Sequence, residues 1–506
     1  TWTRMPAGQA AVIQRMRFER PGRYALVFGG LPRVWRFTDY WNLPPEDVPQ
    51  CNVRATERGF LLDDVKTFGR AEIVVPGRRR VYADLADAWE GASPRERGRV
   101  GVVDLEGDDI VWYGVQGCED LPHPDAEAAW DAARTEWERT WEAAFAPGNG
   151  EFSGHLPVYR GELDRLYYMS VLTLLMTRRL LPAPTRRAGI ATGGQCIWSE
   201  PARPLERSYV WGGVEGAPTT CVLWETSFQA PILARLDPAV LRAQLEAFLR
   251  VDLRRHWGIE TVSGRGAGME YGVNGGAFLS CVEEYVRVTG ERAWARAIGD
   301  SLRSLCRPDL TDYGECQNIL ECVGSYEHFV ASFNALQVRG ARFLAGLLGD
   351  PDLARRADDL ERRVLDLYAG GPFACLQPDG SRRVVRTVLD FVYVGSCLDV
   401  PDRLRRGMLE FFERELRTED WLRALSSDDP DALTAALPSF QTFRADHQAT
   451  GSYTGWPALA ASVLLRWGER DRAVAWLRRI QELTREGPFG QACFLHPGGA
   501  RKASFF

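Results

Sequence analysis

The sequence has very little net charge and almost no lysine. Its 62 basic and 68 acidic residues leave a formal charge of −6 over 506 residues. Proteins that bind nucleic acid or an anionic membrane surface carry a basic patch or stripe instead. The charge pattern therefore argues against both kinds of partner. Only Lys66 and Lys502 are lysine, so arginine supplies nearly all of the basic charge, a skew that carries little functional information.

Long hydrophobic runs and CxxC pairs are also missing. No apolar stretch reaches the ~18 residues of a membrane-spanning helix, and the N-terminal TWTRMPAGQAAVIQRM does not resemble a signal peptide. The 11 cysteines are an odd number without a CxxC pair, which favours buried thiols in a reducing compartment over a metal site. We therefore expect a cytoplasmic protein without a metal ion. A secreted enzyme whose signal peptide has been removed stays open, and so does a homo-oligomer.

What the sequence does contain indicates a folded protein with many aromatic rings. Hydrophobic residues make up 45% of the chain and charged residues 26%, as in globular and not disordered proteins. The 17 Trp, 15 Tyr and 23 Phe suggest either very large cores or flat apolar platforms for ligands. Sugars are ligands that stack on such platforms.

Hydrophobic patterning divides the chain into three parts. Short runs rich in β-branched and aromatic residues, such as YALVFGG and AEIVVPG, fill residues 1–122 and predict an antiparallel β-domain. Residues 123–150 show a helical period with three Trp on one stripe, which predicts a linker helix. From 151 to 506 nearly every apolar segment has helical length. We therefore predict a mainly α protein, in which a helical barrel follows an N-terminal antiparallel β-sandwich-like domain.

A recurring glycine signal indicates repeated helical hairpins in the third part. Gly290, Gly349 and Gly468 each end a helix-like segment and precede an acidic residue and an Arg- and Ala-rich segment. Glycine adopts the left-handed conformation that ends a helix, and an acidic residue favours the start of the next one. The spacings of 59 and 119 residues fit one unit of 59 and two such units. Six units would form an (α/α)6 toroid. An open solenoid is the alternative, but the long acidic and aromatic connections favour the toroid.

Two segments in the first half of the helical part carry candidate binding residues. CVLWETSF places Trp224 and Glu225 ahead of a helix that we predict to start near Gln229. A carboxylate beside an indole can bind sugar hydroxyls, although Glu225 could equally favour the helix N-terminus. The glycine-rich segment around Glu270 and Asn274 contains no GxGxxG after a strand, so it predicts a close-packed loop before a helix.

Two later segments hold carboxylates suited to acid–base chemistry. Asp312, Glu315 and Glu321 alternate with apolar residues in segment 312–327, and partial burial there would raise a carboxyl pKa as a general acid requires. Helix capping and surface ion pairs are the alternative. Asp446 lies in the polar loop FRADHQATGSYTGW, where it would stay ionised and could activate water. Two such carboxyl groups, held ~6.5–9.5 Å apart, perform inverting glycoside hydrolysis.

One further acidic residue, Asp390, has a structural explanation, and one other function is excluded for Asp446. Asp390 lies alone in the apolar run RTVLDFVYVG and is expected to be an internal, hydrogen-bonded carboxylate. Asp446 is adjacent to His447, but the sequence has no GxSxG elbow, so this pair does not indicate a serine hydrolase.

The order of these segments resembles the six-hairpin glycosidases, and most closely glycoside hydrolase family 63 with its bacterial relatives. The segments that carry the resemblance are EFSGHLPVYRGELDRLYYMSVLTLL, LWETSFQAPILARLDP, DYGECQNILECVGSYEHFVASFNALQ and FRADHQATGSYTGW, which lie within residues 130–490. The resemblance implies an (α/α)6 barrel and inverting hydrolysis of an α-glucoside or related glycoside without a metal cofactor.

The resemblance also implies roles for matching residues. Trp224-Glu225 occupies the place of a Trp-Asp pair that contacts substrate, which makes Glu225 a binding residue. The family's acid lies before the central helix, in the region of 312–321, where its Ser-Gly-x-Asp pattern is absent; we choose Glu321 because apolar residues flank it. The family's base is a Glu in a Phe-Arg-Glu-Asn segment, where this chain has Ala445 followed by Asp446.

These inferences give two sets of site residues. The catalytic candidates are Glu321 as acid and Asp446 as base, with Glu315 and Asp312 as alternative acids. The predicted substrate-binding residues are Trp211, Trp224, Glu225, Glu270, Asn274, Tyr313, Asn318, His447 and Trp456. The sequence leaves two other functions open. One is a glycoside phosphorylase with a phosphate pocket near Arg444, and the other is a toroid that binds sugar without cleaving it.

Overall fold

The computed structural model describes most of the chain, in two compact units. The described residues are 2–4, 11–29, 52–65, 69–116, 126–180, 205–210, 220–261, 264–268, 271–306, 326–432, 448–490 and 492–503. The first unit comprises Thr1–Glu151 and Arg179–Glu206, and the second comprises Phe152–Arg178 and Arg207–Phe506. The predicted domain division at 122 and 150 stays a prediction.

The first unit is built on one antiparallel sheet. Its strands follow the order β1-β2-β8-β5-β4-β3-β7, and β6 also pairs with β8. Their bounds are β1 Trp2–Arg4, β2 Ala11–Gly29, β3 Asn52–Ala55, β4 Gly59–Val65, β5 Gly69–Val74, β6 Arg78–Tyr82, β7 Arg97–Gly98 and β8 Val100–Gln116. The pairing of β2 with β8 shifts register between Arg17 and Gly22. The strands β2 and β8 therefore each join two strand-like runs of the sequence into one long strand, and their pairing is irregular where the runs meet.

The sheet curls around a buried hydrophobic cluster, and Tyr82, Val100 and Val102 form a second, smaller one. Phe28 of β2, Val53 of β3, Phe60 of β4, Val81 of β6 and Val103 of β8 share one buried cluster. Since these strands come from distant places in the sheet order, the sheet must fold back over itself to bring them together. The predicted antiparallel β-region is confirmed. A short helix, α1 (Leu85–Glu90), and the predicted linker helix, α2 (Ala126–Phe145), also belong to this unit.

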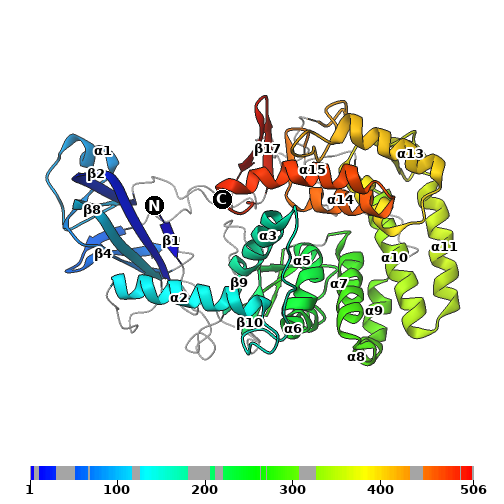
Figure 1. Ribbon diagram of the computed structural model, residues 1–506, viewed down its shortest axis with the longest axis horizontal. Coiled ribbons are helices and arrows are strands. Elements are labelled where there is room, and N and C mark those ends of the chain that lie inside the picture. Colours follow the sequence, from blue (N-terminus) through cyan, green and yellow to red (C-terminus); the bar gives the residue numbers. More distant parts are fainter. Residues whose placement is uncertain are drawn as a thin grey trace. The chain divides into compact units, whose positions relative to one another are not determined.

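Helices make up most of the second unit (Figure 1), which confirms a mainly α chain. They are α3 (Asp164–Met176), α5 (Leu223–Leu236), α6 (Pro238–Phe248), α7 (Asn274–Thr289), α8 (Arg292–Ala297), α9 (Gly299–Leu305), α10 (Ala331–Leu348), α11 (Pro351–Leu365), α12 (Val388–Cys397), α13 (Asp402–Phe411), α14 (Gly455–Arg466) and α15 (Arg470–Glu482). A π-helical turn, Phe412–Leu416, follows α13, and a 3-10 turn, Leu483–Glu486, follows α15. Over the described residues, no helix combines the length and apolar character needed to cross a bilayer.

The glycine signal marks hairpin turns as predicted. Gly290, Gly349 and Gly468 follow α7, α10 and α14 with left-handed φ angles of 75°, 69° and 85°. The helices α8, α11 and α15 begin two residues after these glycines. Asp350 shows how the acidic residue acts, because its carboxylate accepts hydrogen bonds from the first amides of α11. The hairpin of α12 and α13 turns through Pro401 without such a glycine.

One helix from each hairpin belongs to a row of parallel neighbours, α5, α7, α10, α12 and α14. The contacting pairs advance together from Gly276–Leu336 to Leu279–Gly340 between α7 and α10, and from Tyr393–Trp456 to Gly395–Val463 between α12 and α14. Ser332 in the first turn of α10 meets Asp390 in the first turn of α12. The N-terminal ends of these helices therefore lie on the same side of the unit. The row curves back on itself, because the indole rings of Trp224 in α5 and Trp456 in α14 lie 5.2 Å apart between centroids.

Short strand pairs occupy connections that the sequence left irregular. They form from β11 (Thr220–Val222), β12 (Gly258–Glu260) and β13 (Gly266–Ala267), from β14 (Phe373–Leu376) and β15 (Arg382–Val385), and from β16 (Gly451–Tyr453), β17 (Ala492–His496) and β18 (Gly499–Ala503). Strands this short show no readable alternation. Two further strands are β9 (Arg178–Leu180) and β10 (Arg207–Tyr209). The helix α3 ends at Met176, and β9 follows it after Thr177.

Candidate functional site

Four of the predicted site residues lie in the described part of the chain: Trp224, Glu225, Asn274 and Trp456. The others lie outside the described residues, and their roles stay predictions: Trp211, Glu270, Asp312, Tyr313, Glu315, Asn318, Glu321, Asp446 and His447. All four described residues belong to the first turns of helices in the parallel row. The N-terminal side of that row is therefore the candidate site.

The predicted start of α5 near Gln229 was wrong. The helix begins at Leu223, directly after β11, so Trp224 and Glu225 lie in its first turn and not ahead of it. Proline is common in the first turn of a helix, so Pro231 favoured a later start, whereas here it lies inside the helix. The earlier start fixes the directions of Trp224 and Glu225 by helix geometry.

Aromatic rings gather at the N-terminal ends of α5 and α14. Trp224 and Trp456 are each the second residue of their helix, and Phe228 and Tyr453 pack on both of them with centroids 5.2 to 6.0 Å apart. Only 5% of Trp224 and none of Trp456 is exposed. The rings therefore bury most of their area against one another. The predicted stacking of these indoles on a sugar stays a prediction.

Tyr393 of α12 joins this aromatic cluster and was missed by the sequence reasoning. The Nε1–H of Trp224 donates a hydrogen bond of 2.8 Å to the Tyr393 hydroxyl oxygen. Burial raises the pKa of Tyr393 above its ordinary value, and the charge of nearby Glu225 adds to this, so the hydroxyl stays protonated. In the sequence Tyr393 belongs to an otherwise apolar run, and only its position one helical turn after Asp390 could have marked it.

Glu225 is half-buried beside the aromatic cluster. Burial raises the pKa of the Cys221 thiol to about 12, and the Glu225 charge contributes to that rise. The N-cap of α5 is Val222, which offers no side-chain hydrogen bond. A carboxylate in the first turn is favoured by the helix dipole, so the capping interpretation and the sugar-binding interpretation are both compatible with this position.

Asn274 begins α7 and holds a neighbouring turn in place. Its side-chain amide donates hydrogen bonds of 2.9 Å to the Leu253 carbonyl and 3.1 Å to the His256 carbonyl. The loop before it is close-packed, as predicted, because a Cβ on Gly268 would lie 1.9 Å from the Trp257 ring. The donors of Asn274 are therefore used within the fold, and sugar binding by this residue stays a prediction.

Asp390 is the internal carboxylate that the sequence predicted. Its Oδ1 accepts hydrogen bonds from the Tyr326 hydroxyl at 2.8 Å and from the Ser332 amide at 3.0 Å, and the residue is 2% exposed. Burial raises the pKa of Asp390 to about 7, although both hydrogen bonds oppose that rise. The contact joins the first turns of α10 and α12 on the candidate site's side.

The residues just before α10 form a strained, charged turn. His328 has a φ of 63°, which costs energy in a residue with a Cβ. Its imidazole Nε2 lies 3.9 Å from Oε1 of Glu327, and a guanidinium nitrogen of Arg383 lies 3.7 Å from the same oxygen. A bridge between Phe329 and Leu376 of β14 holds this turn against the β14–β15 hairpin. The segment that leads into α10 is thus held by the contact of Glu327 with Arg383 and by the bridge of Phe329 with Leu376.

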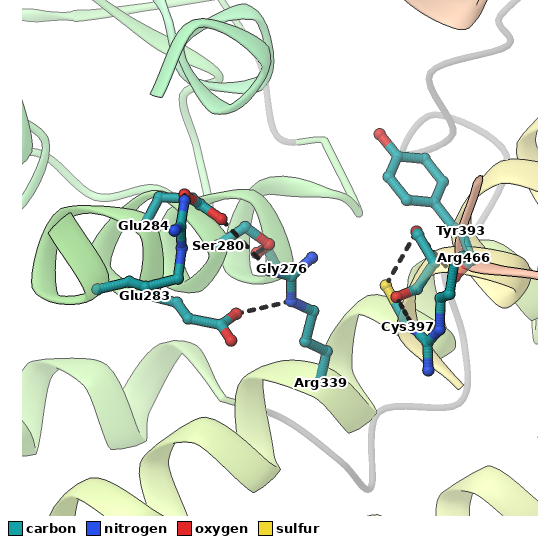
Figure 2. Close-up of polar contacts among 10 residues, drawn as sticks. Gly276, Ser280, Glu283, Glu284, Arg339, Tyr393, Cys397 and Arg466 are labelled. Atoms are coloured by element: carbon teal, nitrogen blue, oxygen red, sulfur yellow. Dashed lines mark hydrogen bonds and ion pairs between the residues drawn. The ribbon is translucent and has the colours of Figure 1, made fainter. Parts of the chain in front are cut away.

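The C-terminal halves of the parallel helices are joined by a separate set of polar contacts (Figure 2). The Nε–H of Arg339 in α10 donates a 2.7 Å bond to Glu283 of α7. Arg466 of α14 donates to the Ser396 and Leu398 carbonyls at the end of α12, which are among the carbonyls that a helix leaves unsatisfied. The guanidinium groups of Arg339 and Arg466 are therefore engaged in contacts between helices.

Two further observations bear on chemistry. Among the described residues, no group of three or more His, Cys, Asp or Glu is arranged to hold a metal ion. Cys221, Cys281, Cys375 and Cys397 are buried thiols, and burial raises the pKa of each of them. Thiols with a raised pKa are poor nucleophiles, so these four do not indicate cysteine chemistry.

Comparison with solved structures identifies the fold. A bacterial glucoamylase complexed with acarbose matches 96% of this chain and 76% of its own, with a TM-score of 0.58 and 9% identity. At this identity the likeness shows the fold alone. The expected resemblance to six-hairpin glycosidases is confirmed at the level of the fold.

Two other solved structures match with lower TM-scores. A rhamnosidase from Klebsiella oxytoca with rhamnose bound has a TM-score of 0.49 at 11% identity, over 97% of this chain and 91% of its own. A GH63 mannosylglycerate hydrolase from Thermus thermophilus in complex with glucose has a TM-score of 0.42 at 13% identity, over 56% of this chain and 90% of its own. No protein-family model and no curated protein matches the sequence.

Proposed function

We propose that this chain is a glycoside hydrolase whose helical unit closes into an (α/α)6 toroid. The observation that carries the proposal is the gathering of Trp224, Glu225 and Trp456 at the N-terminal ends of α5 and α14, where Tyr393 from the middle of α12 joins them, in a chain that shares the fold of a glucoamylase. Indoles and a carboxylate together supply the apolar wall and the hydroxyl acceptor that a sugar site needs. The contact between the first and last helices of the row supports closure of the ring.

The proposed reaction is inverting hydrolysis of an α-glucoside or a related glycoside. Glu321 protonates the leaving oxygen, and Asp446 removes a proton from the attacking water, as the two carboxyl groups of an inverting enzyme do at a separation of ~6.5–9.5 Å. Glu315 and Asp312 are the alternative acids. Glu225 binds sugar hydroxyls beside the aromatic cluster. Arg444 next to this segment would serve a phosphorylase instead, if phosphate replaced the water.

The base assignment is tested with Asp446→Asn. Hydrolysis of 4-nitrophenyl α-D-glucoside and of maltose is measured for the variant and for Asp402→Asn, which alters an exposed carboxylate on α13. Loss of a general base lowers the rate by ~100-fold or more. The control should keep the full rate. Unchanged turnover in Asp446→Asn would remove this residue from the base role.

The acid assignment is tested with substrates of different leaving groups. Glu321→Ala should lose activity on maltose by ~100-fold or more and keep much more on 4-nitrophenyl α-glucoside, whose leaving group needs little protonation. Glu315→Ala and Asp312→Ala serve as comparisons. Equal loss on both substrates, or no loss, refutes the assignment of Glu321, and the selective pattern in one of the other variants transfers the role to it.

Product analysis decides between the three functions left open by the sequence. An inverting hydrolase releases β-glucose from an α-glucoside, which proton NMR detects in the first minutes. Sugar release that requires added phosphate would identify a phosphorylase. Sugar binding by calorimetry without any product after long incubation would identify a non-catalytic sugar-binding protein.

A further inference from the structure

A hydrogen bond joins the predicted sugar-binding turn of α5 to α12. Trp224 lies in the first turn of α5, and the acceptor of its indole N–H is the hydroxyl of Tyr393 in α12 at 2.8 Å. Both side chains are buried. Because the row curves back on itself, α14 lies between α5 and α12 here, and its Trp456 packs on both Trp224 and Tyr393.

The bond is specific to one of the two indoles in the aromatic cluster. Trp456 holds the same position in α14 that Trp224 holds in α5. Within the part of the chain that the structure describes, the Nε1–H of Trp456 has no hydrogen-bond partner. Ring packing alone therefore does not provide an acceptor for a buried indole in this cluster. Tyr393 provides one for Trp224, which fixes the rotation of that ring.

The geometry of Tyr393 leaves its hydroxyl free to act in this way. Figure 2 shows the Tyr393 ring on α12 with its hydroxyl directed away from Cys397. Burial raises the pKa of Tyr393, so its oxygen remains a neutral acceptor over the working range of most enzymes. The charge of Glu225 also raises the pKa of Tyr393.

We propose that Tyr393 is a positioning residue of the sugar site, which fixes the Trp224 indole and with it the first turn of α5 that carries Glu225. This inference rests on the proposed function. A side chain that binds substrate must be held within ~0.5 Å of its productive position, and fixed neighbours provide that precision. The hydrogen bond from Trp224 holds the residue next to Glu225, one helical position away.

The test compares two buried tyrosines in the full-length protein. Tyr393→Phe removes the acceptor and leaves the Trp224 N–H buried and unpaired, whereas Tyr285→Phe removes a buried hydroxyl on α7 beside Trp294. On 4-nitrophenyl α-D-glucoside, Tyr393→Phe should lower kcat/KM about tenfold, mainly through a higher KM, because a buried unpaired donor is costly. Tyr285→Phe should leave both constants unchanged.

A double-mutant cycle separates positioning from general destabilisation. Trp224→Phe alone removes the donor, and adding Tyr393→Phe to it should cost nothing further, because the bond is already absent. The indole N–H resonance that disappears in Trp224→Phe should shift in Tyr393→Phe and stay in place in Tyr285→Phe. If Tyr393→Phe does not fold, the kinetics of Trp224→Phe alone must show the same rise in KM.

Two results overturn the proposal, and they differ from each other. Suppose that the wild type is active. If Tyr393→Phe then has unchanged kinetics, or if it has the same effect in the wild-type and the Trp224→Phe backgrounds, the positioning role is refuted and the glycosidase proposal stays intact. A wild type that neither cleaves nor binds 4-nitrophenyl α-glucoside and maltose refutes the proposed function, and the positioning role fails with it.

Discussion

The Tyr326 hydroxyl lies 2.8 Å from Oδ1 of Asp390 and donates a hydrogen bond that joins the entry of α10 to the first turn of α12. The Ser332 amide donates to the same oxygen, and the hydroxyl groups of Tyr326 and Ser332 lie 2.5 Å apart. Burial raises the pKa of Asp390 to about 7. The carboxyl therefore changes its charge near neutral pH at a place where two helices of the row meet.

Asp390 should make the protein more stable in mild acid. Its pKa in the folded state is about 7, above the ordinary value, so the folded protein binds this proton more tightly than the unfolded chain does. The contribution to stability is full below the unfolded pKa and is lost as pH rises through about 7. Asp390→Asn should remove this pH dependence of the unfolding free energy. The size of the pKa shift sets the effect at a few kcal/mol at most.

Urea unfolding at pH 5 and pH 8 checks this expectation. The fall in unfolding free energy between the two pH values should be smaller in Asp390→Asn than in the wild type. Asp402→Asn, on the exposed side of α13, should keep the wild-type fall. Identical falls in the wild type and Asp390→Asn would show that Asp390 does not titrate between these pH values.

Glu415 should stabilise the second unit at neutral pH and lose this effect in acid, which is the reverse of Asp390. Burial would raise its pKa, but hydrogen bonds from Arg386, Arg414 and Ser426 outweigh burial and lower the pKa to about 2. This stability is present above the unfolded pKa and is lost as pH falls toward about 2. Glu415→Gln leaves Arg386 without its charged partner, so we expect a loss of about 3 kcal/mol at pH 7 and a smaller loss near pH 3.

Chemical denaturation of Glu415→Gln beside Glu419→Gln measures the difference. Glu419 forms an exposed ion pair with Arg479, so its variant should lose less than about 1 kcal/mol at either pH. A similar loss in the two variants at pH 7 would mean that the buried pair with Arg386 contributes no more than a surface pair.

Gly349 and Gly346 should respond to alanine with opposite signs. Gly349 ends α10 with a φ of 69°, which costs a residue with a Cβ about 1–2 kcal/mol. Gly346 lies inside the same helix without a positive φ, and a Cβ there has open space, so Gly346→Ala should stabilise by about 0.5–1 kcal/mol. Thermal unfolding should show a lower Tm for Gly349→Ala and a higher one for Gly346→Ala. Equal changes would contradict a conformational origin.

The hairpin pattern was predictable because glycine and acidic residues act locally. The φ angles of Gly290, Gly349 and Gly468 follow from the need to end one helix and start the next within a few residues. The isolated carboxylate at Asp390 was also predictable, since a charge within an apolar run requires internal hydrogen bonds. The glycine signal is decided within one segment. For Asp390 only the need for internal hydrogen bonds was predictable, because its partners Tyr326 and Ser332 lie 64 and 58 residues away in the sequence.

The site depended on contacts that no local pattern contains. Tyr393 accepts a hydrogen bond from a residue 169 positions away, and apart from its position one helical turn after Asp390, RTVLDFVYVG does not distinguish it from a core tyrosine. The start of α5 was predicted too late because the helix follows directly on β11. The strand β11 is fixed by its pairing with β12, which is a tertiary contact. The burial of Trp224 and Trp456 against each other also required the three-dimensional arrangement.

Asn274→Asp should destabilise the protein and thereby decide between a structural and a sugar-binding role for this residue. Both side-chain N–H bonds of Asn274 go to the Leu253 and His256 carbonyls, and the residue is 3% exposed. A carboxylate there would face two carbonyl oxygens without donors, which we expect to cost about 3 kcal/mol, and Asn274→Ala about 1–3 kcal/mol.

The pH dependence and the sugar affinity of these variants distinguish the two roles. Burial raises the pKa of the introduced carboxyl, so Asn274→Asp should become less stable relative to the wild type as pH rises from 5 to 8. Maltose affinity of the folded fraction, measured by calorimetry at 15 °C, should stay at the wild-type level in Asn274→Ala if the amide only holds the turn before β12. A loss of maltose affinity without a loss of unfolding free energy would instead place Asn274 in contact with the sugar.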